Sequence, residues 1–139
     1  MNPTARFGDS PFHRMLGIEP GEHGARRAEI RMQPRPEFLQ EAGVVQGGLL
    51  AALADAACVY LLLGERTPAE RLTSIEFKVN FLRPGRLDAG PLLAWAEPVR
   101  IGGTIAVARA EVLQAGEALL SGLFTYLRPA AAESKGPHA

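Results

Sequence analysis

Hydrophobic residues form one long run near the middle of the chain and alternate with polar residues along much of its second half. From Gly47 to Leu63 the run is apolar on every side of a helical projection except at Asp55. A helix without a polar stripe is enclosed by protein or by lipid. A membrane span needs about 20 mainly apolar residues, whereas this run is shorter and carries a charge near its middle. The pattern therefore predicts a helix over residues 47–63 that is wrapped by the rest of a globular fold.

After this helix the period of the pattern becomes that of a strand. In residues 74–82 every second side chain is apolar and most of those between are polar, which indicates a half-buried strand that ends at Arg83-Pro84-Gly85. The last three strands are joined by tight turns, so we expect an antiparallel meander. Further strands are expected over residues 27–32, 92–97, 104–112 and 118–127, with turns at 100–103 and 114–117.

The order of elements is a strand, one long helix and four strands, which is an α+β arrangement. A flat sheet cannot cover the circumference of a helix, so the sheet must curl around it. Open edge strands invite pairing, so we expect a dimer joined edge to edge, with further assembly through the outer face of the sheet. The length of 139 residues suits one domain over residues 1–139. We expect its core at about 12–128, a short docking helix at 11–18, and a flexible tail at 129–139.

Composition and charge exclude several classes of function. The chain has 15 basic and 15 acidic residues, so it has no broad electrostatic footprint for nucleic acid or an anionic membrane. The N-terminus lacks the pattern of a signal peptide, and the single cysteine forms no internal disulfide, which fits the cytoplasm. Cys58 is expected in the core rather than as a nucleophile. The histidines are scattered and suggest no metal site; for His13 we expect a surface or capping role rather than a place in a site.

Asp55 is the strongest candidate for chemistry, because a carboxylate in an apolar helix needs a polar partner or a function. The alternatives are an exposed Asp or a buried Asp paired with an Arg. Just before the helix, Gly43-Val44-Val45-Gln46-Gly47-Gly48 places free backbone N–H groups where they can hold a carbonyl oxygen that gains negative charge. Asp55 lies about 12 Å along the helix axis from Gly47, too far for both to grip one reacting carbon. Two antiparallel helices from two subunits would therefore be needed.

These residues resemble a known family. Gly43-x-x-Gln46-Gly47-Gly48, Asp55 nine positions after Gln46, and a strand that ends Asn80-Phe81-Leu82-Arg83-Pro84 are similar to the hotdog-fold acyl-CoA thioesterases of the PaaI-like, phenylacetate-degradation group. The resemblance covers most of residues 12–128. It implies a hotdog fold, in which about five to six antiparallel strands wrap one central helix. It also implies dimers that often pair into tetramers, and hydrolysis of an acyl-CoA thioester without a metal or cofactor.

The resemblance assigns roles to individual residues. Gly47 would supply the oxyanion N–H, and Asp55 would be the nucleophile or the base that activates water. Ser74, or its neighbour Thr73, falls where the family has a hydroxyl that orients water. Gln40 falls where many members have Asn or Gln near the attacking group, and Gly48 belongs to the same substrate-binding helix start.

Gln46 departs from the pattern, because many members have His at this position. A Gln amide can still donate to the thioester carbonyl but cannot transfer a proton. This disfavours an acyl-CoA hydratase or dehydratase, which needs a loop His. A non-catalytic acyl-CoA-binding protein remains the other alternative.

Substrate contacts are less clearly marked. Tyr60 is expected at the floor of a pocket that the alanines of the helix leave roomy enough for a medium-chain or aromatic acyl group. Arg71, Arg83 and Arg86 suit the phosphates of coenzyme A, although each is equally compatible with a solvated surface charge. No acyl group is identified by these residues.

Overall fold

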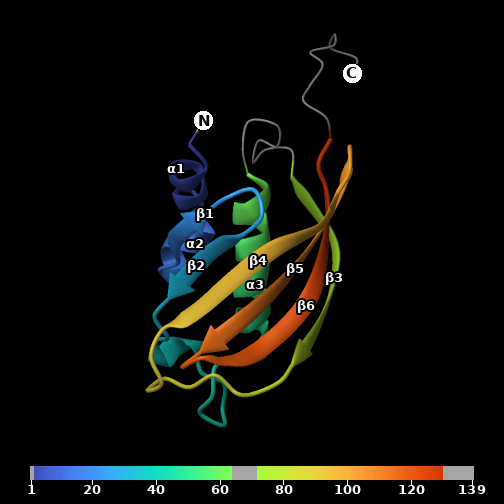
Figure 1. Cartoon of the computed structure of the whole chain (residues 1–139). Coiled ribbons are helices and arrows are strands. Elements are labelled where there is room, and N and C mark those ends of the chain that lie inside the picture. Colours follow the sequence, from blue (N-terminus) through green and yellow to red (C-terminus); the bar gives the residue numbers. More distant parts are fainter. Residues whose placement is uncertain (1, 64–71, 130–139) are drawn as a thin grey trace.

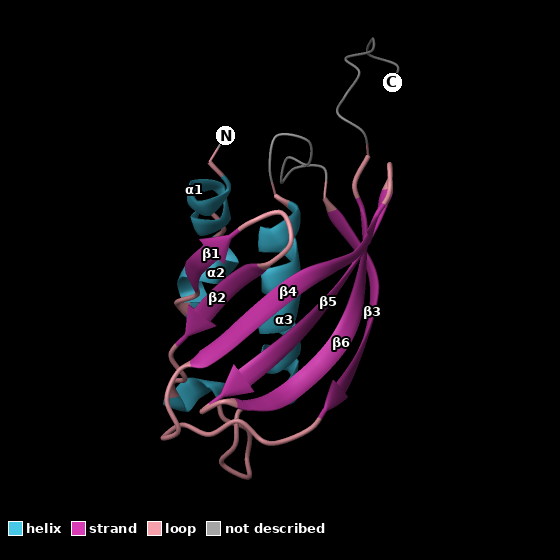
Figure 2. Ribbon diagram, in the orientation of Figure 1, coloured by secondary structure: helices cyan, strands magenta, loops and turns pink. Residues whose placement is uncertain are grey.

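The apolar run forms one helix, α3 (Gly47–Leu62), around which a single antiparallel sheet curls (Figures 1 and 2). The structure is a computed structural model that describes residues 2–63 and 72–129. Both the predicted helix and the α+β hotdog architecture are confirmed. The part of the expected tail that falls at 130–139 and the candidate Arg71 lie outside the described residues.

Within the part of the chain that the structure describes, the sheet has six strands in the order β1-β2-β4-β5-β6-β3, and all neighbours are antiparallel. The predicted meander is present as β4, β5 and β6, and the β5–β6 connection is a tight turn with positive φ at Ala115 and Gly116, as a two-residue hairpin loop requires. The strands are β1 (Glu19–His23), β2 (Ala28–Met32), β3 (Thr73–Phe81), β4 (Leu92–Ile101), β5 (Ile105–Gln114) and β6 (Glu117–Leu127).

Short side chains bring the helix close to the sheet. The inward residues of β5 are fully or almost fully buried, and three of the five are Ala106, Ala108 and Ala110. The surface of α3 that packs on β2, β4, β5 and β6 also contains alanines, such as Ala54 and Ala57. Because interiors are close-packed, small residues on both surfaces mean a short distance between them rather than a void.

Two elements at the N-terminus were not predicted. Helix α1 (Pro3–Gly8) buries Phe7, which is 1% exposed and packs on the ring of Tyr60, so the core begins before the expected residue 12. Strand β1 contains Pro20 and Gly21, and apolar and polar residues do not alternate along it. It pairs with β2 through backbone hydrogen bonds, which no side-chain pattern predicts. The expected docking helix is α2 (Pro11–Leu16), and a short 3₁₀ helix, η1 (Pro36–Phe38), follows β2.

Candidate active site

Asp55 lies on the one stripe of α3 that the sheet leaves partly open. Gly48 is exposed, and Ala52, Asp55 and Val59, which follow it on the same side of the helix, are half-buried. The opposite side of α3 is buried. The expectation of a helix wrapped on all sides is therefore wrong for this stripe, because a six-stranded sheet within one chain does not close around the helix.

A residue of the sheet holds the carboxylate of Asp55 by a hydrogen bond. The hydroxyl of Tyr126, on β6, donates a hydrogen bond of 2.6 Å to Asp55 Oδ1. Burial raises the pKa of Asp55, while the hydrogen bond from Tyr126 and the charge of nearby His13 act in the opposite direction. Among the described residues no Lys or Arg pairs with Asp55, so the alternative of an Arg-paired structural carboxylate is not what the chain forms.

His13 is close enough to Asp55 for their charges to interact, although a surface or capping role was expected. Its ring stacks on Phe7 at 4.1 Å between centroids, and Nδ1 lies 3.1 Å from the Phe7 carbonyl oxygen. A carbonyl only accepts, so Nδ1 carries the proton and donates it. Burial lowers the pKa of His13, and the charge of Asp55 partly opposes this effect.

Cys58 is fully buried one turn after Asp55, and burial raises the pKa of its thiol. A thiol kept protonated is a poor nucleophile. The prediction that Cys58 is a core residue is confirmed.

Ser74 lies beside the Asp55–Tyr126 pair. In the β3–β6 ladder Ser74 is directly opposite Tyr126, whereas Thr73 is opposite Leu127. Opposite residues of an antiparallel pair point to the same face of the sheet, and successive residues point to opposite faces. Ser74 therefore shares the helix-facing side with Tyr126, and Thr73 points to the other side.

The start of α3 presents free backbone donors. The N–H groups of Leu49 and Leu50 donate to the carbonyl of Gln46, at 3.0 and 3.4 Å. Within the described residues no acceptor is bound to the N–H groups of Gly47 and Gly48, and the Gln46 side chain makes no capping hydrogen bond. These two donors at the positive end of the helix dipole can bind an oxyanion.

Two hollows flank this helix start. One, of about 360 Å³, contains three of the predicted site residues, Gln40, Gly47 and Arg83. The other, of about 390 Å³, contains Gln46 and Gly48 at the foot of a mostly apolar wall. The remaining lining of the first hollow is Val44, Val45, Leu50, Phe81, Leu82 and Pro84, and that of the second is Phe12, Leu16, Glu37, Phe38, Leu39, Leu49 and Ala52.

Two predicted substrate contacts lie apart from these hollows. Tyr60 is fully buried, and its hydroxyl donates to the carbonyl of Gly21 and hydrogen-bonds with Thr4. Arg86 lines neither hollow, although its backbone is anchored by two hydrogen bonds with the Gln114 side chain. Arg83 is in place but pairs with Glu117 at 3.5 Å.

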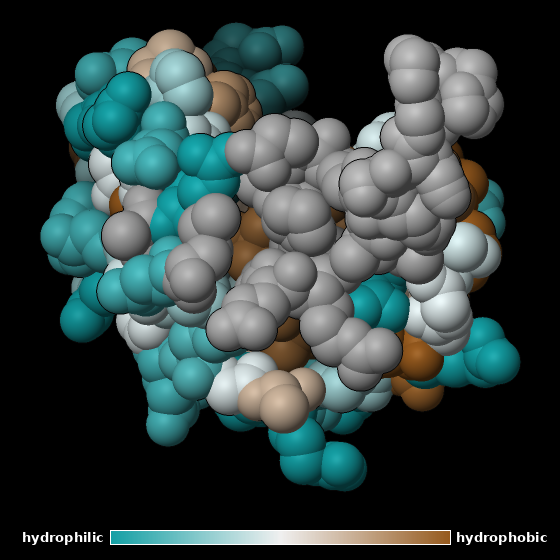
Figure 3. All heavy atoms as spheres, turned by 90° about the horizontal axis from the view of Figure 1, so that it is seen from above, coloured by the Kyte–Doolittle hydropathy of each residue, from teal (hydrophilic) through white to brown (hydrophobic). Residues whose placement is uncertain are grey.

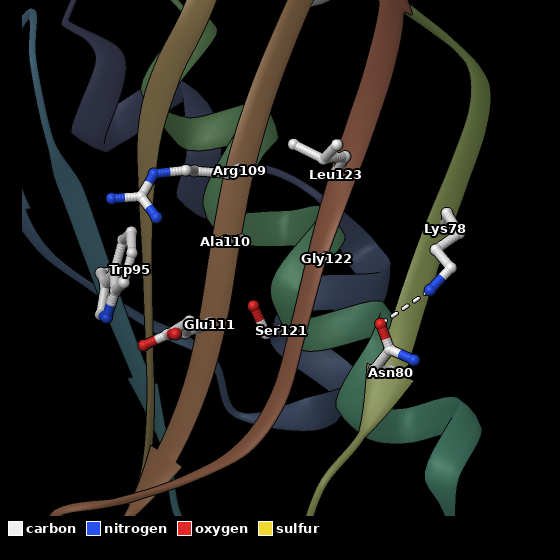
Figure 4. Close-up of a pocket in the computed structure, with 9 residues that line it drawn as sticks. All are labelled: Lys78, Asn80, Trp95, Arg109, Ala110, Glu111, Ser121, Gly122 and Leu123. Carbon is white, nitrogen blue, oxygen red and sulfur yellow. Dashed lines mark hydrogen bonds between the residues drawn. The ribbon is translucent and has the colours of Figure 1, made fainter.

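A third hollow, of about 320 Å³, lies on the far side of the sheet from Asp55. Figure 4 shows its charged and polar side chains in front of the strands, with α3 behind them. The floor is made by Ala110 and Gly122, and the walls include Trp95, Arg109 and Lys78. Because the sheet separates it from Asp55, this hollow is not part of the candidate active site.

The sequence analysis missed Tyr126 and did not place His13 in the site. No motif marks Tyr126, and the available signal was a phenol among the inward, apolar residues of β6, where a buried hydroxyl requires a partner. Its partner is 71 residues away in sequence, so only the fold reveals the pair.

Comparison with known proteins finds relatives of most of the chain. The family model described as "Thioesterase superfamily" matches residues 42–121, more than half of the chain. The medium/long-chain acyl-CoA thioesterase YigI of Escherichia coli strain K12 is 26% identical over 117 residues, a match that covers 73% of this chain and 74% of the relative.

Solved structures show the same fold. A thioesterase family protein from Silicibacter pomeroyi superposes with a TM-score of 0.79 at 26% identity, covering 93% of this chain and 96% of the other. A mutant of the phenylacetic acid degradation protein PaaI from Thermus thermophilus superposes with a TM-score of 0.73 at 25% identity, covering 86% of this chain and 99% of the other.

Proposed function

The chain belongs to the thioesterase superfamily, as a PaaI-like hotdog thioesterase, and from this membership we propose that it hydrolyses acyl-CoA thioesters with Asp55 as the reacting carboxylate. The observation that carries the proposal is the position of Asp55. It is a half-buried carboxylate on the open stripe of the central helix, held by Tyr126 and paired with no cation among the described residues. Such a group is costly to keep unless it reacts.

A second copy of the chain would complete the site. Strand β3 pairs with β6 along one edge only, and its helix-facing residues Phe77 and Phe81 are 50% and 56% exposed. Helix α3 packs on the other strands of the sheet, against β1, β2, β4, β5 and β6. An open edge with apolar side chains is suited to pairing with an identical strand, which would bring the two central helices together.

The two ends of β3 carry the two halves of the site. At one end, Ser74 lies beside Tyr126 and Asp55. At the other end, the ring of Phe81 packs on Gly47, where an added Cβ would lie 3.2 Å from the ring. A two-fold axis through the middle of β3 sets the Phe81 end of one copy against the Ser74 end of its partner. Each Asp55 would then face the Gly47 N–H of the other subunit.

The chemistry follows from these groups. The N–H of Gly47 and the amide of Gln46 hold the thioester oxygen as it gains charge. Asp55 attacks the carbonyl carbon to form an anhydride that water then hydrolyses, or it takes a proton from a water that Ser74 orients and that attacks the same carbon. In both routes the C–S bond breaks, coenzyme A leaves as a thiolate, and the free acid is released. A thiol of ordinary pKa, about 8.5, leaves readily without a general acid, so a loop His is not needed. No metal or other cofactor takes part in this reaction.

We propose medium-chain or aromatic acyl groups as substrates. The hollow beside Gln46 and Gly48 has an apolar wall that includes Leu16, Phe38 and Leu49, which is more than an acetyl group would fill. The relative YigI, named as a medium/long-chain acyl-CoA thioesterase, agrees with this choice. Arg83 lines the hollow beside Gly47, and we propose that it binds the phosphates of coenzyme A. A cytoplasmic location, which the single cysteine fits, belongs to the same proposal.

The test is a panel of acyl-CoA esters with thiol release as the readout. We expect higher kcat/KM for hexanoyl-CoA and phenylacetyl-CoA than for acetyl-CoA, by about tenfold or more, because buried methylenes add about 1 to 3 kcal/mol. Asp55→Asn should lower kcat by several orders of magnitude in a protein that still folds. Tight binding without thiol release from any ester would instead identify a non-catalytic acyl-CoA binder. Equal or better use of acetyl-CoA would overturn the substrate assignment alone.

A further inference from the structure

Tyr126 makes the one hydrogen bond that the described residues offer to the carboxylate of Asp55. The phenol is 1% exposed, and its hydroxyl lies 2.6 Å from Asp55 Oδ1 and 3.4 Å from the backbone oxygen of the same residue. Because this donor engages Oδ1 and none of the described residues donates to Oδ2, the second oxygen is left for another partner.

We propose that Tyr126 is a positioning residue for the reaction, which fixes Asp55 through Oδ1 so that Oδ2 is the atom that attacks the thioester or takes the proton of water. This inference rests on the proposed function. The phenol ring of Tyr126 is buried in the hydrophobic core, so its side chain is already fixed. It therefore orients the carboxylate with little further loss of conformational entropy on each turnover. Tyr126 itself does not touch the substrate.

The electrostatic surroundings give the hydrogen bond a second effect. Among residues 2–63 and 72–129, three titratable groups face Asp55: Tyr126 from β6, His13 from α2 and Cys58 from α3. Burial raises the pKa of the Cys58 thiol and of the Tyr126 phenol, so both stay neutral, and burial also lowers the pKa of His13. The donated hydrogen bond therefore keeps the Asp55 carboxylate ionised down to a lower pH than burial alone would allow.

Tyr126→Phe tests the proposal because it removes only the hydroxyl. We expect kcat to fall about tenfold or more, and the acidic limb of the pH profile of kcat/KM to move to higher pH by about one unit, as loss of a charged hydrogen bond predicts. A purely structural role would lower stability without moving that limb. A variant that keeps the wild-type rate and limb would overturn the proposal.

Tyr60→Phe is the matched control. Tyr60, on α3, is also fully buried, and its hydroxyl is also hydrogen-bonded, but to Gly21 and Thr4 rather than to Asp55. We expect loss of this hydroxyl to lower the melting temperature and leave the acidic limb unchanged. An equal shift of the limb in both variants would show that general loosening of the fold, and not Tyr126, moves it.

A second measurement keeps the test valid if Tyr126→Phe does not fold. The chain has 2 Tyr, so in the Tyr60→Phe variant 3-fluorotyrosine labels Tyr126 alone. The fluorinated phenol is a stronger donor, so the acidic limb should move to lower pH; an unchanged limb would overturn the proposal. Failure of the parent function is seen separately, because in that case the unaltered protein releases no thiol or Asp55→Asn retains its activity.

Discussion

Among single residues, Asp55 combines a proposed catalytic role with a cost to stability. Its carboxylate is half-buried, with the hydroxyl of Tyr126 as its hydrogen-bond donor and no paired cation among the described residues. Burial raises its pKa above that of the unfolded chain. Between these two pKa values the folded protein binds more protons than the unfolded protein, so the free energy of unfolding falls as pH rises through this range. Above the range, the ionised carboxylate destabilises the folded protein by its full amount.

Asp55→Asn should therefore raise the melting temperature at pH 8 while it abolishes turnover. Asn keeps an oxygen that accepts from Tyr126 but carries no charge. The gain should shrink as pH falls toward 3.8, the ordinary pKa of the carboxyl. Thermal unfolding at several pH values measures the effect, and Asp88→Asn, at an exposed position, is the control with no expected gain. A lower melting temperature for Asp55→Asn at pH 8 would contradict the electrostatic account.

At the scale of elements, the first turn of α3 carries the proposed oxyanion site. Gly47 is the first helical residue, and its N–H needs no partner inside the helix. The preceding Gln46 has φ −56° and ψ 130°, an extended conformation that a following proline accepts. The helix start can therefore lose one N–H without losing its shape.

Gly47→Pro removes this N–H, since proline is tolerated at the first helical position. Gly47→Ala is the matched control, because its Cβ meets the same Phe81 ring at 3.2 Å but the N–H is kept. We expect kcat of the Pro variant to be about 100-fold or more below that of the Ala variant, as for loss of one oxyanion donor. Equal rates would show that this N–H does not stabilise the transition state. Circular dichroism checks that the helix forms in both variants.

For the whole molecule, the decisive feature is the free edge of β3. In Figure 1 this strand lies at the end of the sheet opposite β1. Seen from above, hydrophilic residues dominate the left of the face in Figure 3, and several apolar patches lie toward the right, the side of β3 in Figure 1. A second copy at this edge would bury apolar side chains and bring Asp55 to the partner's Gly47.

Mixing two inactive variants tests whether the site is shared. When Asp55→Asn and Gly47→Pro chains pair at random, about half of the dimers are heterodimers. Each heterodimer has one intact composite site out of two, so we expect about a quarter of the wild-type activity. If one chain supplied both groups, mixing would restore nothing. The chains are unfolded together and refolded to exchange partners, and each variant refolded alone is the control.

The sequence by itself determined the elements that a local pattern of hydrophobic and polar residues marks. The helix over 47–62 follows from an unbroken apolar run that carries one charge, and five of the six strands follow from alternating or apolar segments between turn residues. It also marked Asp55 as the one charge in an apolar helix and Gly47 as its flexible start. The spacing of these two residues was enough to argue for two helices in the active site, which stays a prediction.

Only the tertiary structure decided which distant residues meet. The pairing of β6 with β3 and the packing of β6 on α3 place Tyr126 on Asp55 and Ser74 beside it. The stacking of His13, on α2, against Phe7, on α1, goes with a position near the same carboxylate. The tertiary structure also buries Tyr60 in the core, away from the candidate site. Periodicity identifies the face that is buried but not the partner that buries it, because that choice depends on the order of strands in the sheet.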